Sequence, residues 1–268
     1  MFFRTRKTSP GDNGRAKFAY FVSKKLPLIR FSNGQLPCWS IFSLSDKQAA
    51  YAAEQVIRLG LADQVRIGLR DYRDLEEESF EKIVSVGIFE HVGRNNLPKY
   101  FSRAYRLLKP GDIFLNYGIA RRGRPADPDL LKGLDGHSHD FSTGQSYFER
   151  KMLGLGSFSQ HYIFPDGELV PVSEANLIAE AVGFEVRDVE NLREHYALTL
   201  RNWVRRLEEQ HAEAARLVGE AVYRTWRLYM SFCAAAFESA QICVNQSLLA
   251  KPVNGKANLP MSRADLYL

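Results

Sequence analysis

The chain has 268 residues, of which 45% are hydrophobic and 25% are charged, as is usual for a globular protein. Its formal charge of +5 is spread unevenly: residues 1–30 contain eight Lys and Arg and one Asp, a net charge of +7 that leaves −2 for the rest. The folded body therefore lacks the basic face that nucleic acid binding requires. We expect no nucleic acid partner.

The cysteine content and the hydropathy indicate a cytoplasmic protein. Cys38, Cys233 and Cys243 are too few for a disulfide framework and lack the spacing of metal ligands, which points to a reducing compartment. No apolar run approaches the roughly 18 residues that span a bilayer. Behind the basic N-terminus there is no apolar core of a signal peptide.

The first third of the chain changes character at about residue 38. Residues 1–37 show little periodicity and predict weak order, with Phe18–Val22 as either a short strand or a helical turn. Residues 38–44 predict a buried strand. Ser45 begins a capping-box pattern for a helix that runs to about Leu59.

Strands and helices alternate in the rest of the chain, which predicts a parallel sheet with helices on its faces. The predicted strands are 64–69, 83–86, 113–120, 185–189 and 242–250, with a turn at 110–112, and the predicted helices are 97–108, 173–181 and most of 193–240. Large apolar residues of the last helical region form either core or the lining of an acyl-chain channel: Leu198, Trp203, Leu207, Leu217, Val222, Trp226 and Tyr229.

The stretch Phe80–Gly93 is the strongest sign of a functional site. It begins as the apolar strand Ile83–Val86 and places Glu90 and His91 just past the carboxyl end of that strand. Ligands of open α/β sheets bind at this edge. We therefore predict that Glu90 is functional. The alternative is that Glu90 caps or pairs locally and that His91 is a satisfied residue of the rim.

A second polar segment lies between residues 133 and 144. It contains four potential metal ligands, Asp135, His137, His139 and Asp140. Ligands confined to one short loop, with no helix or strand to hold them, are weak evidence for a metal. We predict that the protein has no metal site.

Five segments, in this order, resemble the cyclopropane-fatty-acyl-phospholipid synthases and the mycolic acid cyclopropane synthases, which are class I methyltransferases that use S-adenosylmethionine. They are residues 43–49 (SLSDKQA), 71–74 (DYRD), 83–93 (IVSVGIFEHVG), 164–169 (FPDGEL) and 194–200 (EHYALTL). The resemblance covers residues 43–268. It implies an α/β fold with a Rossmann-like methyltransferase sheet and a helical insertion on the substrate side.

The resemblance also implies a reaction. A methyl carbon would pass from S-adenosylmethionine to the cis double bond of an unsaturated phospholipid acyl chain and close a cyclopropane ring, with a bound bicarbonate ion as the base. An alkene is a poor nucleophile, so the donor must be held in line and close. The protein is then expected to be cytoplasmic and peripheral at the inner membrane, where it meets its lipid.

The resemblance also implies site residues. Glu90 would orient the bicarbonate ion, the backbone around Ile119 would contact it, and Tyr196 would hydrogen-bond to it. Cys233 matches a cysteine often regarded as catalytic in the family, with a small buried thiol as the alternative. Tyr117 stands where the family usually has the histidine of the anion site, and a phenol is not cationic at neutral pH.

The expected cofactor contacts lie at two strand ends. Ser43, Leu44 and Gln48 would meet the ribose and methionine of the cofactor. Asp71 would accept from the adenine amino group and Tyr72 would stack on the ring. The alternative for Asp71 is a residue of the turn at the strand end.

Residues 1–42 depart from the family. The family has a strand and a Gly-rich turn before the segment that matches Ser43, whereas Gly11, Gly14 and Gly34 are isolated. We expect the first strand and this turn to be missing or degenerate, and residues 1–42 to be an atypical segment before a methyltransferase-fold domain at 43–268. Activity is then expected to be impaired. The alternatives are a methyltransferase that adds a plain methyl group, and a non-catalytic chain that keeps a lipid-binding surface or assembles as a homodimer.

Overall fold

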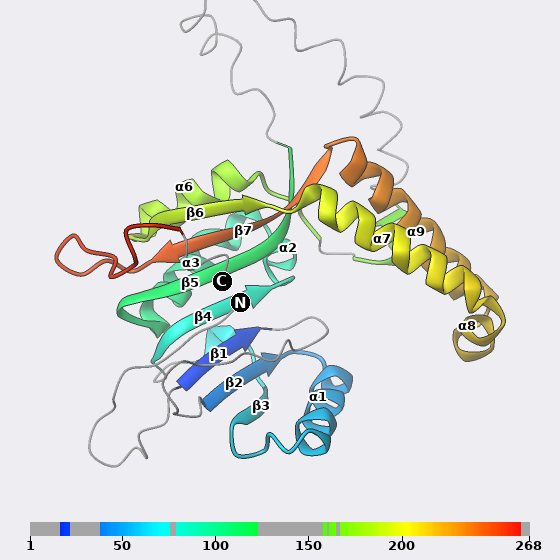
Figure 1. The fold of residues 1–268 in the computed structure, drawn as a ribbon, viewed down its shortest axis with the longest axis horizontal. Helices are drawn as coiled ribbons and strands as arrows, with labels where there is room; N and C mark the ends of the chain where they lie inside the picture. The colour runs from blue at the N-terminus through cyan, green and yellow to red at the C-terminus, as the bar shows by residue number, and fades with distance from the viewer. Residues whose placement is uncertain are drawn as a thin grey trace, which may run out of the picture. The chain divides into compact units, whose positions relative to one another are not determined.

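The computed structural model describes residues 17–21, 38–75, 79–122, 158–159, 161–164 and 167–263, with only the backbone described for 17–21 and 38. In chain order the elements are β1 (Lys17–Phe21), β2 (Cys38–Ser43), α1 (Asp46–Arg58), β3 (Val65–Leu69), the 3-10 turn η1 (Tyr72–Asp74), β4 (Phe80–Val86), α2 (Phe89–Val92), the 3-10 turn η2 (Arg94–Asn96), α3 (Leu97–Leu107), β5 (Leu108–Arg121), α6 (Val172–Val182), β6 (Glu185–Asn191), α7 (Arg193–Glu209), α8 (His211–Val218), α9 (Glu220–Glu238) and β7 (Ile242–Ala250) (Figure 1).

The chain forms two compact units. The first comprises Met1–Ile119, Glu174–Glu190 and Asn245–Leu268, and the second comprises Ala120–Ser173 and Asn191–Val244. The first unit holds most of the sheet, and the second unit holds the helices α7, α8 and α9.

The strands form a seven-stranded sheet in the order β3-β2-β1-β4-β5-β7-β6. The pairs from β3 through to β5 are parallel, and in Figure 1 the arrow of β7 runs opposite to those of its neighbours. The order reverses at β1, because β2 and β3 lie on one side of it and β4 and β5 on the other. In open α/β sheets the ligand crevice lies at such a reversal, at the carboxyl ends of the strands.

The central strand corrects one expectation from the sequence. We expected the first strand to be missing or degenerate, yet Lys17–Phe21 pairs with β2 on one side and with β4 on the other. Its registers are Tyr20 with Ile41 and Tyr20 with Val84. Backbone pairing on both sides satisfies the strand's amides and carbonyls whatever its side chains, so a short and weakly patterned segment can fill this place. The expected boundary at residue 43 falls at the last residue of β2, and the expected position of the Gly-rich turn, between β1 and β2, lies outside the described residues.

The predicted turn at residues 110–112 is part of strand β5. Leu108 pairs with Phe80 and Ile113 pairs with Lys82, so six residues of β5 face three of β4 and the register shifts between them. Gly111, with φ +86°, supplies the backbone conformation that this bulge needs. Its amide donates to the carbonyl of Lys251 at 2.8 Å, which holds the bulge within the strand.

The core of the first unit forms where β4 and β5 meet helix α3. Ile83, Val84 and Phe114 have no exposed surface, and each such side chain contributes about 1.5–3 kcal/mol on burial. The buried positions of α3 follow helical spacing, as predicted: Leu97, Tyr100, Phe101, Ala104 and Leu107. This packing fixes the strand ends that carry the candidate site.

The second unit contains a helical region close to the one predicted at 193–240. Gly219, with φ +84°, separates α8 from α9. Ion pairs join α7 to α9 at two places, Arg201 to Glu238 at 2.6 Å and Arg227 to Glu208 at 2.6 Å. All four side chains are exposed, and such pairs contribute about 0.2–1 kcal/mol each, so they align the helices more than they stabilise them.

Candidate active site

Glu90 is buried at the carboxyl end of strand β4. The strand ends at Val86, Gly87 turns the chain with φ +69°, and Glu90 follows on the single-turn helix α2. Its side chain is 9% exposed, and its Oε1 accepts a hydrogen bond from the amide of Ile119 at 2.7 Å. His91, next to it, is exposed on the rim. The structure therefore brings Glu90 and Ile119 together, two of the residues that we predicted to form the site.

The environment of Glu90 changes its protonation. Burial raises the pKa of its carboxyl group from 4.5 to about 7, against the opposing effect of the amides of Ile119 and of Glu90 itself. Its other oxygen, Oε2, is buried and has no hydrogen-bond partner among the described residues. A carboxyl group of this kind can hold or release a proton near neutral pH, and the unpartnered oxygen can accept a hydrogen bond from a ligand.

Gly118 makes the contact between Glu90 and Ile119 possible. A Cβ atom at this position would lie 2.9 Å from Cδ1 and 3.0 Å from Cβ of Phe89, the residue before Glu90. Strand β5 can therefore approach α2 closely only because residue 118 has no side chain in the way. We did not predict a role for Gly118, although a glycine inside an apolar strand is the signal that could have indicated one.

Tyr117 lies beside this contact on β5. Its side chain is half-buried, and its carbonyl accepts from the amide of Gly87 at 3.1 Å. This bond ties the turn after β4 to the neighbouring strand. The backbone of residues 117–119 thus supports the whole segment that presents Glu90.

The first group of predicted cofactor residues lies at the end of strand β2. Ser43 Oγ donates to Gln48 Oε1 at 3.2 Å and accepts from the amide of Ser45 at 3.1 Å. Ser45 Oγ in turn accepts from the amide of Gln48 at 3.3 Å and caps helix α1, as the capping pattern predicted. Leu44 is 70% exposed, although it is a large apolar residue at the ligand edge of the sheet.

The second group follows strand β3. Asp71 caps the turn η1 through a hydrogen bond from the amide of Arg73 to Oδ1 at 2.8 Å, and its Oδ2 accepts from Arg73 Nε at 2.9 Å. The Arg73 guanidinium lowers the pKa of the Asp71 carboxyl group below its usual value. Tyr72 is half-buried, with its ring edge-on to Tyr100 at 5.6 Å between centroids. Asp71 thus has the contacts of a turn residue, the alternative that the sequence left open, while its carboxylate remains at the ligand edge.

Tyr196 and Cys233 belong to the second unit. Tyr196 on α7 is half-buried, and its ring packs edge-on against Phe237 at 4.9 Å. Cys233 on α9 is 9% exposed, and burial raises the pKa of its thiol to about 11. The thiol is therefore protonated at neutral pH, which agrees with the alternative of a small buried apolar group.

Aromatic rings form two groups of contacts in the second unit. Tyr196 contacts Trp203 as well as Phe237, at 6.2 Å between centroids. Tyr229 contacts both Phe164 and Trp226 at 5.9 Å. Trp203 is 44% exposed and Trp226 is 42% exposed, so each leaves apolar surface open. These are large apolar surfaces that a hydrocarbon chain can contact.

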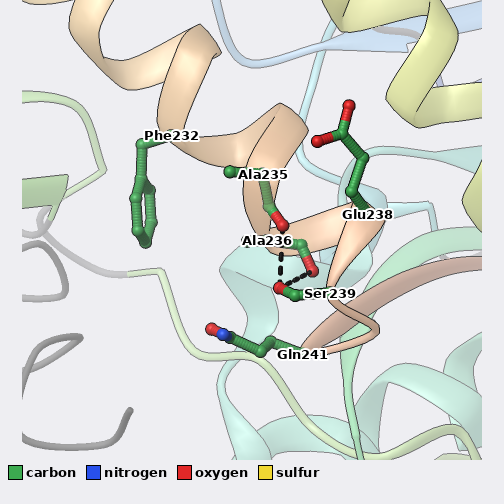
Figure 2. A pocket seen from close by; sticks show the side chains of 6 residues that line it. All are labelled: Phe232, Ala235, Ala236, Glu238, Ser239 and Gln241. Carbon is green, nitrogen blue, oxygen red and sulfur yellow. Dashed lines mark hydrogen bonds between the residues drawn. The ribbon is translucent and has the colours of Figure 1, made fainter.

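A pocket of about 420 Å³ lies at the end of helix α9, where the sequence suggested no site. Figure 2 shows Phe232 and Gln241 on one side of the helix end, with Glu238 directed away from them. Glu238 is bound by Arg201, and Ser239 Oγ donates to the carbonyl of Ala235 at 2.7 Å. The remaining lining residues are Ala235 and Ala236. Glu238 and Ser239 thus already have partners, and among the described residues the pocket shows no group of polar side chains directed at one point.

Neither a metal-ligand cluster nor a membrane-spanning helix is found in the part of the chain that the structure describes. The described residues contain no group of three His, Cys, Asp or Glu side chains that could hold a metal ion. The loop with Asp135, His137, His139 and Asp140 lies outside those residues. Among the helices that the structure describes, none is long and apolar enough to cross a bilayer.

Comparison with known proteins identifies relatives of this chain. A family model described as "Mycolic acid cyclopropane synthetase" matches residues 40–247. A "Probable fatty acid methyltransferase" of Pseudomonas putida is 39% identical over 227 residues, which are 84% of this chain and 52% of that protein. A relative of the same description from Mycobacterium tuberculosis is 33% identical over 220 residues, or 82% of this chain and 46% of its own length. This chain thus spans about half the length of these two relatives.

Solved structures agree with this match. The cyclopropane synthase MmaA2 from Mycobacterium tuberculosis superimposes with a TM-score of 0.67 at 25% identity, over 81% of this chain and 70% of that one. The mycolic acid cyclopropane synthase CmaA1 complexed with SAH and CTAB gives a TM-score of 0.68 at 29% identity, over 80% and 70%. The chain therefore belongs to the mycolic acid cyclopropane synthetase family of class I methyltransferases.

Proposed function

We propose that this protein transfers the methyl carbon of S-adenosylmethionine to the double bond of a cis-unsaturated fatty acyl chain and closes a cyclopropane ring. One observation carries the proposal: the buried Glu90 carboxyl group has a pKa near 7, is oriented by the Ile119 amide and keeps one oxygen without a partner among the described residues. A reaction that removes a proton in an apolar site needs such a group.

The residues at the carboxyl ends of β2 and β3 fit the cofactor. Ser43 and Gln48 offer a hydroxyl and an amide for the ribose and the amino-acid part, and Leu44 offers exposed apolar surface. Asp71 and Tyr72 offer a carboxylate and an aromatic ring for the adenine. When bound there, S-adenosylmethionine supplies an electrophilic methyl group.

Glu90 would orient the base that takes the proton released on ring closure. The alkene electron pair would form the new bond to the methyl carbon as the bond from that carbon to the cofactor sulfur breaks, which leaves S-adenosylhomocysteine. Loss of one proton from the same carbon would then close the ring. By family resemblance a bicarbonate ion would supply the base, and Glu90 Oε2, which has no partner among the described residues, would accept a hydrogen bond from the hydroxyl of that ion. In its ionised form Glu90 would also stabilise the positive charge that develops on the substrate.

The aromatic rings of the second unit support an acyl substrate. The half-exposed Trp203 and Trp226 and the half-buried Tyr196 and Tyr229 offer apolar faces for a hydrocarbon chain. Aromatic faces also stabilise a passing cation. In this proposal Cys233 remains a neutral thiol, and the role of Tyr196 at the anion rests on the family resemblance alone.

A phospholipid substrate places the protein at a membrane surface. We propose that it is cytoplasmic and binds the inner membrane peripherally through a local basic patch of Arg121, Arg122 and Arg124. Arg122 is exposed at the end of strand β5, and Arg121 donates to its carbonyl at 3.1 Å. Arg124 lies outside the described residues.

A second candidate is the transfer of a plain methyl group to a fatty acyl chain. It is favoured by the description of the two relatives reported above, which are named fatty acid methyltransferases. Both reactions share the cofactor, the alkene and the first bond formed. They differ in which carbon loses the proton: loss from the transferred carbon closes a ring, and loss from another carbon leaves a branch and a double bond.

The test uses the full chain, S-adenosylmethionine and vesicles of either cis-unsaturated or saturated phosphatidylglycerol. The proposal predicts S-adenosylhomocysteine formation with the unsaturated lipid alone, and ring protons in the NMR spectrum of the extracted lipid. A methyl or methylene branch in place of the ring would establish the second candidate. Equal S-adenosylhomocysteine formation with saturated lipid would contradict both.

A further inference from the structure

The turn that carries Asp71 and Tyr72 is held from outside by helix α3. This turn, Asp71–Asp74, follows strand β3, and only part of its order is local. Locally, Asp71 binds the amide and the guanidinium of Arg73, and the amide of Asp74 donates to the carbonyl of Asp71 at 3.0 Å. These bonds fix the shape of the turn. They do not fix where the turn lies against the rest of the first unit.

Arg103 supplies that attachment. It lies on α3, about 30 residues further along the chain. Its Nε donates to the carbonyl of Tyr72 at 3.4 Å, and its terminal guanidinium nitrogen donates to the carbonyl of Arg73. A planar guanidinium can bond two consecutive carbonyls at once, which an ammonium group cannot do with the same geometry.

Tyr100, one turn before Arg103, supports the same attachment. Its ring meets that of Tyr72 at an interplanar angle of 87°, and its hydroxyl donates to Asn116 Oδ1 at 2.8 Å. Tyr100 is 3% exposed and Asn116 is 6% exposed, so this link runs through the core to strand β5. The backbone of the turn and the ring of Tyr72 are therefore both fixed by α3.

We propose that Arg103 is a positioning residue for the cofactor, which holds the Asp71–Asp74 turn so that Asp71 and Tyr72 are preorganised for the adenine. The proposal rests on the proposed function, since it assumes that this turn meets the cofactor. A turn that is already ordered loses less conformational freedom when the ligand binds. The smaller entropic cost makes the binding tighter. Arg103 would therefore affect cofactor binding and leave the chemical step unchanged.

The experiment compares Arg103→Gln with Arg106→Gln in the full chain. Arg106 lies on the same helix and is exposed, and its side chain makes no hydrogen bond or ion pair among the described residues. It is therefore the matched control. Equilibrium dialysis with labelled S-adenosylmethionine should show about tenfold weaker binding for Arg103→Gln and no change for Arg106→Gln. Turnover at saturating cofactor should match the wild type. Arg103→Lys should recover part of the affinity, because it can bind one of the two carbonyls.

Hydrogen exchange of the cofactor-free protein provides a readout that needs no ligand. The amides of Arg73 and Asp74 should exchange faster in Arg103→Gln than in the wild type or in Arg106→Gln. Equal cofactor affinity for Arg103→Gln and the wild type would overturn the proposal, as would a fall in turnover at saturating cofactor. A wild-type chain that binds no cofactor would refute the proposed function and the cofactor role of Arg103 together. Unchanged exchange would then also refute the attachment of the turn.

Discussion

Replacing Glu90 by glutamine should stabilise the protein above pH 7 while it lowers turnover. The carboxyl group has a pKa of 4.5 when exposed and about 7 in the folded protein. A shift of this size, at about 1.4 kcal/mol per pH unit, corresponds to about 3 kcal/mol.

The sign follows from the proton count. Below pH 4.5 the group is protonated in both states, and no penalty applies. Between pH 4.5 and 7 the folded protein keeps a proton that the unfolded chain releases, so stability falls as the pH rises. Above pH 7 the folded protein carries the full cost of a buried charge. Glutamine avoids this cost and still offers a carbonyl oxygen to the Ile119 amide.

The assay is urea unfolding at pH 5 and pH 8, together with turnover and cofactor affinity at pH 8. Relative to the wild type, Glu90→Gln should gain up to about 3 kcal/mol at pH 8 and much less at pH 5. Cofactor affinity should remain near normal while turnover falls, which marks a role in the transition state. Glu180→Gln, at an exposed position of α6, should leave the stability, the turnover and the cofactor affinity unchanged. Loss of stability in Glu90→Gln at both pH values would mean that the carboxylate is structural, and the assignment of the site to Glu90 would be wrong.

Four further outcomes are expected. S-adenosylmethionine should bind this chain at least about 2 kcal/mol more weakly than a family member with a Gly-rich turn. The glycines of residues 1–42 are isolated in the sequence, and each hydrogen bond that a Gly-rich turn would add contributes about 1 kcal/mol. Ordinary micromolar binding in calorimetry would contradict this. Tyr117→His should raise turnover in a chimera whose first 42 residues come from such a family member, and an unchanged rate would show that the phenol is an adequate substitute. Gly118→Ala should lower turnover, since its Cβ would lie 2.9 Å from Phe89 Cδ1 and displace Glu90 from Ile119. A second change, Phe89→Leu, should restore part of the turnover. Normal turnover in Gly118→Ala would refute the steric argument. Replacing Arg121, Arg122 and Arg124 by serine should weaken binding to anionic vesicles at low salt, by about 1 kcal/mol per arginine, and leave the melting temperature nearly unchanged; unchanged vesicle binding would exclude the patch.

Most of the fold could be predicted because its strands and helices have strong patterns. The run Ile83–Val86 is apolar except for Ser85, as is typical of a strand buried on both faces, and α3 buries residues at helical spacing. The sequence of strand β1 has no pattern strong enough to distinguish a strand from a helical turn. It has only five residues, and its place at the centre of the sheet is determined by pairing with β2 and β4, which are distant in sequence.

The candidate site likewise combines a position that the sequence predicts with contacts that it does not. The position of Glu90 could be predicted, because a polar residue just after a buried strand lies at the ligand edge. Its contact with Ile119, the close approach at Gly118 and the attachment of Tyr72 by Arg103 join residues about 30 positions apart. No local pattern encodes such contacts. They appear only once the sheet brings β5 and α3 beside β4 and the turn after β3.

We propose that this chain moves a methyl carbon from S-adenosylmethionine into an unsaturated acyl chain, with Glu90 orienting the base that takes the released proton. The most direct measurement is the transfer of carbon-13 from methyl-labelled S-adenosylmethionine into cis-unsaturated phospholipid, followed by NMR of the extracted lipid for the wild type and Glu90→Gln. The account predicts a labelled ring carbon with the wild type and a much smaller signal with the variant. Absence of label from the lipid, or equal labelling by both proteins, would contradict it.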